Sequence, residues 1–367
     1  MSNPTICFTH DDALDLFRGE NGARFGGAET QVYLLARTLA DASPFDVRVV
    51  TNRDPAGATH EGIDFVRGRS PISQGVPLIS RVINRQRAEA PYRSLGDGVL
   101  VQTIAGPNTV AVWRAARKLG LKFVYRMSCD ADVDGRLLTS PLKNDYLRAL
   151  ADADGVMAQS PYQQQRLRTE LSVESMVVPN LVELPAKASD SEGTYVLWVG
   201  RAAPVKRPWV FIETARTLPD INFVMVMPRE DHLFWLSVTP ETETLPNLQL
   251  IPGAPYFEMD QHYRGAAMLA GTSAFEGFPN VFLQAAAHGK PVVSLDGDPG
   301  GMLKQHNAGY DAEGDIESFR ARIVQWMADA SERRRVGSSA REYVTSVHSP
   351  ASVTPALVEF FSQVLGT

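Results

Sequence analysis

The feature that most constrains this chain is a repeated alternation of short β-branched runs with segments of helical periodicity. One such helix is "AETQVYLLARTLADA" (28–42), where Val32, Leu35 and Leu39 share a face. Alternating strands and helices build parallel sheets that are covered by helices. The strands expected in the first half are "TICF" (5–8), "VRVVT" (47–51), "GVLVQT" (98–103), "KFVYRM" (122–127), "GVMAQS" (155–160) and "SMVVPN" (175–180).

The same alternation starts again after a polar stretch, "ELPAKASDSEGT" (183–194), which has the composition of a linker. The sequence therefore predicts two doubly wound α/β domains, 1–185 and 186–348, with ligands beyond the carboxyl ends of the strands. An amphipathic helix, "SVTPALVEFFSQVLG" (352–366), lies in the last segment, 349–367, and its pattern allows packing on either domain. The strands expected in the second half are "YVLWVG" (195–200), "NFVMVM" (222–227), "LQLIPG" (248–253), "MLAGTS" (268–273) and "PVVSLD" (291–296).

The composition is that of a soluble globular protein, with 44% hydrophobic and 21% charged residues in a chain of 367. Cys7 and Cys129 lie far apart without metal-ligand spacing, so we expect reduced thiols. The first residues lack a signal-peptide pattern, and no apolar run approaches the ~20 residues that a membrane span needs. We expect a cytoplasmic protein without a nucleic-acid partner.

Charge is unevenly spread along the chain. The net charge is −6. Between Val66 and Arg126, however, there are eleven basic residues and only two acidic ones, Glu89 and Asp97, a balance of 11 − 2 = +9. Such a region favours an anionic partner, such as a phosphate or a lipid head group, although a merely solvated surface explains it equally well. Segment 67–93 interleaves arginines with apolar residues, which suits either a peripheral membrane contact or an ordinary core-facing segment.

The segment "WVGRAAPVKRP" (198–208) carries two cations just past a predicted strand. The strand ends at Gly200, and Arg201 and Lys206 follow where ligands bind. A guanidinium and an ammonium there can neutralise a diphosphate. The alternative is that Lys206-Arg207-Pro208 simply begins a surface helix, since proline suits the first turn.

The segment "EGFPNVFLQAAAHGKPVV" (276–293) places a carboxylate before a turn that opens a helix. Main-chain N–H groups at Asn280 and Val281 would attract an anion, while Glu276 can accept hydrogen bonds from sugar hydroxyls. Gln284 lies one turn into the helix and could reach another hydroxyl. The alternative role for Glu276 is to cap the helix. A weaker signal is Gly26-Gly27 before the first long helix, which could let a backbone approach a ligand or could be a flexible loop.

Taken in order, "FGGAE", "VVPNLVEL", "WVGR…K" and "TSAFEGFPNVFLQAAAHGKPVV" resemble the signature segments of family 4 retaining glycosyltransferases, glycosyl transferases group 1. The resemblance covers nearly the whole chain. It implies the GT-B fold, in which two Rossmann-like domains face each other across a cleft. It also implies a nucleotide-sugar donor, no metal or other cofactor, and a last helix that crosses back to the N-terminal domain.

Carried over residue by residue, Arg201 and Lys206 resemble the pair that binds the donor diphosphate, and Glu276 resembles the carboxylate that holds the transferred sugar. The family's second glutamate, which holds the ribose, is here Gln284. An amide still accepts a hydroxyl hydrogen bond but without charge assistance. The donor-binding residues implied by the resemblance are Gly26, Gly27, Gly200, Phe278, Pro279, Asn280, Val281 and Gln284.

The first half departs from the family pattern at "VYRMSCDADVDG" (124–135), which lacks the histidine that many members carry after a middle strand. Asp130 becomes the candidate catalytic carboxylate, orienting the acceptor or the donor sugar. Arg126 and Ser128 are further candidates for the acceptor site. For any one of them a solvated loop is the alternative.

These features together predict a retaining, metal-independent transferase that moves a sugar from a nucleoside-diphosphate sugar to a glycan or lipid-linked acceptor. The reaction would serve glycan, polysaccharide or glycolipid assembly. Two alternatives share the fold: a nucleotide-sugar epimerase and a catalytically silent nucleotide-sugar binder. A dinucleotide-dependent oxidoreductase is disfavoured because neither half places GxGxxG directly after a strand.

Overall fold

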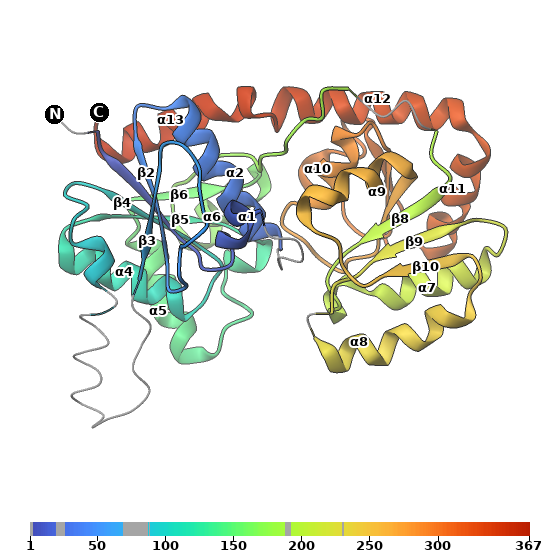
Figure 1. Cartoon of the computed structure of the whole chain (residues 1–367), viewed down its shortest axis with the longest axis horizontal. Helices are drawn as coiled ribbons and strands as arrows, with labels where there is room; N and C mark the ends of the chain where they lie inside the picture. Colours follow the sequence, from blue (N-terminus) through green and yellow to red (C-terminus); the bar gives the residue numbers. More distant parts are fainter. Residues whose placement is uncertain (1–2, 20–25, 69–86, 88, 188–191, 230) are drawn as a thin grey trace. The chain divides into compact units, whose positions relative to one another are not determined.

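The computed structural model describes the chain except residues 1–2, 20–25, 69–86, 88, 188–191 and 230 (Figure 1). The chain divides into two compact units. The first contains the described residues up to Leu181 together with Val353–Thr367, and the second is Val182–Ser352. The boundaries expected from the sequence, after 185 and after 348, lie a few residues from these.

The first unit is built on a parallel sheet with strand order β3-β2-β1-β4-β5-β6-β7. Strand β1 pairs with β2 on one side and with β4 on the other, with Phe8 opposite Val49 and Val101. The central strands are rich in β-branched and aromatic residues and are buried on both faces, as parallel sheets require. The strands are β1 (Thr5–Thr9), β2 (Asp46–Thr51), β3 (Ile63–Arg67), β4 (Val99–Thr103), β5 (Lys122–Arg126), β6 (Gly155–Ala158) and β7 (Met176–Val177).

Helices cover this sheet and close its core (Figure 1). One core cluster joins the fully buried aromatic residues Phe123, Tyr125 and Tyr146 to aliphatic side chains from neighbouring helices. The helices of the first unit are α1 (Leu14–Arg18), α2 (Gly27–Ala42), α4 (Pro107–Leu119), α5 (Ser140–Ala151), α6 (Pro161–Leu171) and α13 (Pro350–Leu365).

Helix α13, the last of the chain, packs on the first unit. Its residues Val353, Leu357, Phe360 and Phe361 are buried. The ring of Phe361 meets that of Phe45 edge-on, at 6.2 Å between centroids. The apolar face of the helix predicted at 352–366 is therefore satisfied within the first unit.

The second unit repeats the plan with strand order β10-β9-β8-β11-β12-β13, all parallel. Its strands are β8 (Tyr195–Val199), β9 (Phe223–Val226), β10 (Leu248–Ile251), β11 (Ala266–Gly271), β12 (Val292–Ser294) and β13 (Gly309–Asp311). Its helices are α7 (Pro208–Thr217), α8 (His232–Val238), α9 (Met259–Gly265), α10 (Asn280–Ala287), α11 (Ile316–Ala328) and α12 (Ala330–Val347).

A close backbone approach holds α12 against the end of α10. A Cβ atom on Gly337 would lie 1.9 Å from the carbonyl oxygen of Gly289, so only glycine fits there. This contact fixes the end of the helix that the segment 276–293 was predicted to open.

The predicted fold class, two doubly wound α/β units, is confirmed. Among the described strands, β3 and β13 were missed by the sequence pattern. Strand β3 is an edge strand with half-buried side chains, and β13 has only three residues. Neither presents the buried, β-branched run by which the inner strands were recognised.

Candidate active site

Each sheet has a topological switch point, at which successive strands stop being added on one side of the first strand and are added on the other. In the first sheet this point lies between β1 and β4, and in the second between β8 and β11. The connections leave in opposite directions there, so the carboxyl ends of the two strands stay open to a ligand. In the second unit these ends carry the segments that begin at Gly200 and Thr272, both singled out from the sequence.

Hydrogen bonds join these two segments. The indole N–H of Trp198 donates to Oγ1 of Thr272 over 2.8 Å, and that hydroxyl donates to the carbonyl oxygen of Lys206 over 2.7 Å. The main-chain N–H of Ala274 donates to the carbonyl oxygen of Val205 over 2.8 Å. The backbone that carries Lys206 is thus fixed from the neighbouring strand.

Lys206 and Glu276 form an ion pair between Nζ and Oε1 at this position. Their side chains are 21% and 26% exposed, so both are accessible to a ligand and partly shielded from water. The alternative role of Glu276 as a helix cap is not observed, because α10 begins after Pro279 without a side-chain cap. Two residues predicted from segments seventy positions apart therefore meet at the switch point.

Arg207 anchors the same loop and was missed as a site residue. Its backbone is left-handed, with φ of 48°, which is uncommon outside glycine. Its Nη2 donates to the carbonyl oxygen of Ser273 over 2.8 Å and its Nε to that of Thr272 over 2.5 Å, with Asp296 at 3.5 Å. The only signal in the sequence was Pro208, since a residue before proline avoids the right-handed helical region.

Arg201 is exposed and follows Gly200 directly after β8. A Cβ atom on Gly200 would lie 2.8 Å from the ring of Trp198, so the chain passes close over the indole. Arg201 and Lys206 thus lie on one loop at the switch point. Their predicted contact with a diphosphate stays a prediction.

The start of α10 is built by buried residues. Phe278 is 6% exposed, and its ring lies 4.8 Å from that of His348. Pro279 is buried, and Asn280 and Val281 are half-buried in the first helical turn. The helix start is therefore held rigidly beside Glu276, as an anion-binding helix N-terminus would require.

The side chain of Gln284 already has a partner. The phenol of Tyr263 donates to its Oε1 over 2.6 Å. Tyr263 is 1% exposed, and burial raises the pKa of its phenol, so it remains a donor. The ring of Tyr263 stacks on that of His288 at 5.4 Å, which fixes its position. The ribose role of Gln284 stays a prediction.

In the first unit, Gly26 and Gly27 lie at the start of α2, after β1. The carboxylate of Glu29 folds back over this start: a Cβ atom on Gly26 would lie 2.7 Å from Oε2. Nε2 of His10 lies 3.9 Å from the other oxygen of Glu29, and Nδ1 of His10 is buried without a hydrogen-bond partner among the residues that the structure describes. His10 and Glu29 were not predicted, although His10 directly follows the first strand.

Arg126 and Ser128 follow β5, and both have contacts that hold the local structure. Arg126 is 2% exposed and donates to the carbonyl oxygen of Val178 and to Oδ1 of Asn180, over 3.0 and 2.7 Å. Burial lowers the pKa of its guanidinium to about 10. Ser128 donates to Asp132 from both its hydroxyl and its main-chain N–H, over 2.7 Å each. Their predicted acceptor roles stay predictions.

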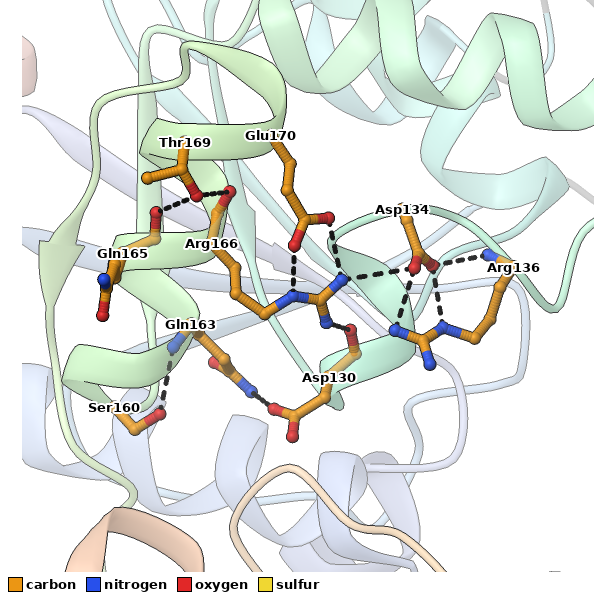
Figure 2. A network of polar contacts seen from close by, with 9 residues as sticks. All are labelled: Asp130, Asp134, Arg136, Ser160, Gln163, Gln165, Arg166, Thr169 and Glu170. Atoms are coloured by element: carbon orange, nitrogen blue, oxygen red, sulfur yellow. Dashed lines mark hydrogen bonds and ion pairs between the residues drawn. The ribbon is translucent and has the colours of Figure 1, made fainter.

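Asp130 lies in the same loop and is half-buried (Figure 2). Burial raises the pKa of its carboxyl group above the ordinary value. Nε2 of Gln163 donates to its Oδ1 over 2.9 Å, and Nη1 of Arg166 donates to its carbonyl oxygen over 3.0 Å. The predicted carboxylate is thus held in place by helix α6.

The basic region between Val66 and Arg126 has less unpaired positive charge than its number of basic residues suggests. Five of its described basic residues are paired with carboxylates, four of them with aspartates from outside the region. These pairs are Arg67–Asp54, Arg114–Asp145, Arg117–Asp154, Lys122–Asp154 and, within the region, Lys118–Glu89. Most of segment 67–93, predicted to contact a membrane, lies outside the described residues.

Within the described part of the chain, no three His, Cys, Asp or Glu side chains gather as metal ligands would. Among the described helices, none combines the length and the apolar character that crossing a bilayer demands.

Comparison with known proteins gives three kinds of match: a curated relative, solved structures and family models. A curated relative, the D-inositol 3-phosphate glycosyltransferase of Mycobacterium sp. (strain KMS), is 27% identical over 137 residues, which cover 33% of this chain and 31% of the relative. The match thus spans about a third of the curated relatives' length. The sucrose-phosphate synthase of Thermosynechococcus elongatus superposes with a TM-score of 0.82 at 15% identity, over 99% of both chains.

A glycosyltransferase from Rickettsia africae superposes with a TM-score of 0.76 at 14% identity, over 100% of this chain and 99% of that one. At such identities these structures show the fold alone. Residues 25–184 match the model described as Glycosyltransferase Family 4, and residues 183–343 match Glycosyl transferases group 1. The two matches adjoin and between them take in both units. The resemblance seen in the sequence is confirmed: the chain belongs to the family 4 glycosyltransferases and has the GT-B fold.

Proposed function

We propose that this protein transfers a sugar from a nucleoside-diphosphate sugar to an acceptor hydroxyl and that the sugar keeps its anomeric configuration. The observation that carries the proposal is the ion pair of Lys206 and Glu276 at the switch point of the second sheet. A cation and a carboxylate side by side suit a ligand that combines phosphates with hydroxyls.

The charges indicate how each group would act. The negative charge on the leaving diphosphate grows in the transition state, and Lys206 and Arg201 offset it together with the N–H groups at the start of α10. The diphosphate competes with Glu276 for the ammonium of Lys206. The carboxylate then accepts hydrogen bonds from hydroxyls of the transferred sugar. Two cations and a helix start supply this stabilisation, so the proposed reaction needs no metal.

The proposed acceptor is a glycan or a lipid-linked hydroxyl compound bound by the first unit, as in polysaccharide or glycolipid assembly, and the proposed location is the cytoplasm. The curated relative is named for an inositol 3-phosphate, which makes a phosphorylated acceptor part of the proposal. The basic residues of segment 67–93 would contact anionic head groups, each contributing roughly 1 kcal/mol.

Vesicle co-sedimentation tests the membrane contact. The proposal expects binding to anionic but not to neutral vesicles, lost at high salt and in a variant with Arg81, Arg85 and Arg87 changed to Ser. Equal recovery in the supernatant with both vesicle types would instead favour an acceptor free in solution.

The function itself is tested by a panel of UDP-, GDP- and other nucleotide sugars. A true donor raises the melting temperature, because it binds only the native state, and is then consumed with formation of a glycoside. An epimerase would change the sugar without transferring it. A silent binder would shift the melting temperature and leave every donor intact with every acceptor offered.

A further inference from the structure

Gln163 is a fully buried polar residue that the sequence analysis did not single out. It is the third residue of α6, whose N-cap is Ser160, so the segment S-P-Y-Q has the spacing of a capping box. In a standard capping box the third residue bonds the N-cap main chain. Here Oε1 of Gln163 accepts instead from the main-chain N–H of Gln159, over 2.8 Å.

The other end of the amide faces a different element. Nε2 of Gln163 donates to Oδ1 of Asp130, over 2.9 Å, and Asp130 belongs to the loop after the neighbouring strand β5 (Figure 2). A glutamate could serve the cap equally well, because it too accepts from a main-chain N–H. An ionised glutamate has no donor left for a carboxylate, whereas an amide accepts from the main chain and also donates to Asp130.

The main chain of Asp130 is fixed as well. Arg166, one turn along α6, donates from Nη1 to its carbonyl oxygen over 3.0 Å. The guanidinium of Arg166 is itself held by Glu170, over 2.6 and 2.8 Å, and by Asp134, over 3.3 Å (Figure 2). Oδ2 of Asp130, by contrast, has no hydrogen bond within the described part of the chain. One carboxylate oxygen is thus bound and the other is left for a ligand.

We propose that Gln163 is a positioning residue for transfer: its amide holds Asp130 so that Oδ2 accepts a hydrogen bond from the acceptor hydroxyl and orients it. This inference rests on the proposed function and gives the acceptor of that reaction its first contact in the first unit.

The arrangement sets a pH dependence whose sign follows from the contacts. Burial raises the pKa of Asp130, and so does the charge of Asp132, while the hydrogen bond from Gln163 and the charges of Arg166 and Arg136 lower it. The ionised carboxylate accepts from the hydroxyl more strongly than the protonated acid does, so activity toward the acceptor falls as the pH drops through this pKa. Removing the amide donor raises the pKa, and the acid limb moves to higher pH.

Two substitutions separate positioning from capping. Gln163→Glu keeps the acceptor for the N–H of Gln159 but turns a carboxylate toward Asp130. Gln163→Met removes both of these contacts and also the hydrogen bond from Nε2 to Oε1 of Gln159, which spans 3.3 Å. Gln164→Met is the matched control, because Gln164 donates to the carbonyl oxygen of Ser175 over 2.6 Å and does not touch Asp130. Thermal unfolding of each variant shows that it is folded before assay.

The kinetic test uses the donor and acceptor identified by the panel. Asp130→Asn is expected to lower kcat/KM for the acceptor about 100-fold, as misplaced reactants do, while hydrolysis of the donor by water changes much less. Both Gln163 variants are expected to lower kcat/KM for the acceptor about tenfold or more. They should also move the acid limb of its pH profile to higher pH. Gln164→Met should match the wild type.

A ¹³C NMR titration of the labelled aspartate carboxyls, with Asp130→Asn to assign the signal, reads the pKa of Asp130 without any substrate. An upward shift in Gln163→Glu is expected. The proposal is overturned if Gln163→Glu keeps the wild-type acid limb and kcat/KM, which would leave only a cap, or if Asp130→Asn transfers at the wild-type rate. If the protein consumes no donor, the proposed function is refuted instead. The titration would still report how Gln163 affects the pKa of Asp130.

Discussion

Replacing Lys206 with alanine is the perturbation that the site geometry makes most informative. The substitution removes the ammonium that pairs with Glu276 and leaves the carboxylate at the switch point. If Lys206 stabilises the leaving diphosphate, its removal should reduce the stabilisation of the transition state far more than the free energy of unfolding.

The two magnitudes differ enough to be separated. A group that meets charge developing in the transition state commonly supplies about 3 kcal/mol, which is roughly a 100-fold loss in kcat/KM at about 1.4 kcal/mol for each factor of ten. Both partners keep about a fifth to a quarter of their side-chain surface in solvent. Such a pair contributes at most about 1 kcal/mol to folding, so the melting temperature should fall by only a few degrees, roughly 2–4 °C for a unit of this size.

The assay is donor consumption at limiting donor concentration, with thermal unfolding measured on the same samples. Lys304→Ala is the matched control, because Lys304 also pairs with carboxylates in the second unit, those of Asp311 and Glu313, but at the end of β13. Wild-type kcat/KM in Lys206→Ala, or an equal loss in Lys304→Ala, would refute the diphosphate assignment.

Three further outcomes follow from the site and the fold. Arg201→Ala should also lower kcat/KM on the order of 100-fold with unchanged unfolding, and an unaffected rate would remove Arg201 from the site. Gln284→Glu should tighten donor binding about tenfold, or ~1.4 kcal/mol, with kcat little changed, since ribose contacts are the same in ground and transition states; a changed kcat at equal affinity contradicts the ribose role. Phe361→Ala should destabilise the first unit by about 3–5 kcal/mol in denaturant unfolding, because Phe361 is fully buried. A loss below about 1 kcal/mol would mean that the packing of α13 does not stabilise that unit.

The fold was predictable wherever strands were buried and rich in β-branched residues. The run at 195–200 corresponds to β8 and the run at 122–127 to β5, each within one residue. The edge strands β3 and β13 escaped because half-buried or very short strands carry no such pattern. The start of α10 was predicted from the turn that contains Pro279. The pairing of Glu276, just before that turn, with Lys206 was not predicted.

The site was only partly predictable for a related reason. Sequence reasoning could name Lys206 and Glu276 separately, yet their pairing depends on β8 and β11 being neighbours, which no local pattern states. Arg207 was missed because its side chain bonds the main chain of the loop after β11, and no local sequence pattern indicates that contact. Gln163 was missed because it looks like an ordinary cap until Asp130 is brought beside it.

The central claim is tested most directly by the stereochemistry of the sugar that leaves the donor. In the absence of an acceptor, donor hydrolysis is followed by ¹H NMR over the first minutes, before the released sugar mutarotates. The proposed reaction predicts that the first-formed anomer has the configuration of the donor, and that Lys206→Ala slows its release on the order of 100-fold. An inverted first anomer, an epimerised nucleotide sugar, or no consumption of any donor in the panel with or without acceptors would contradict the claim.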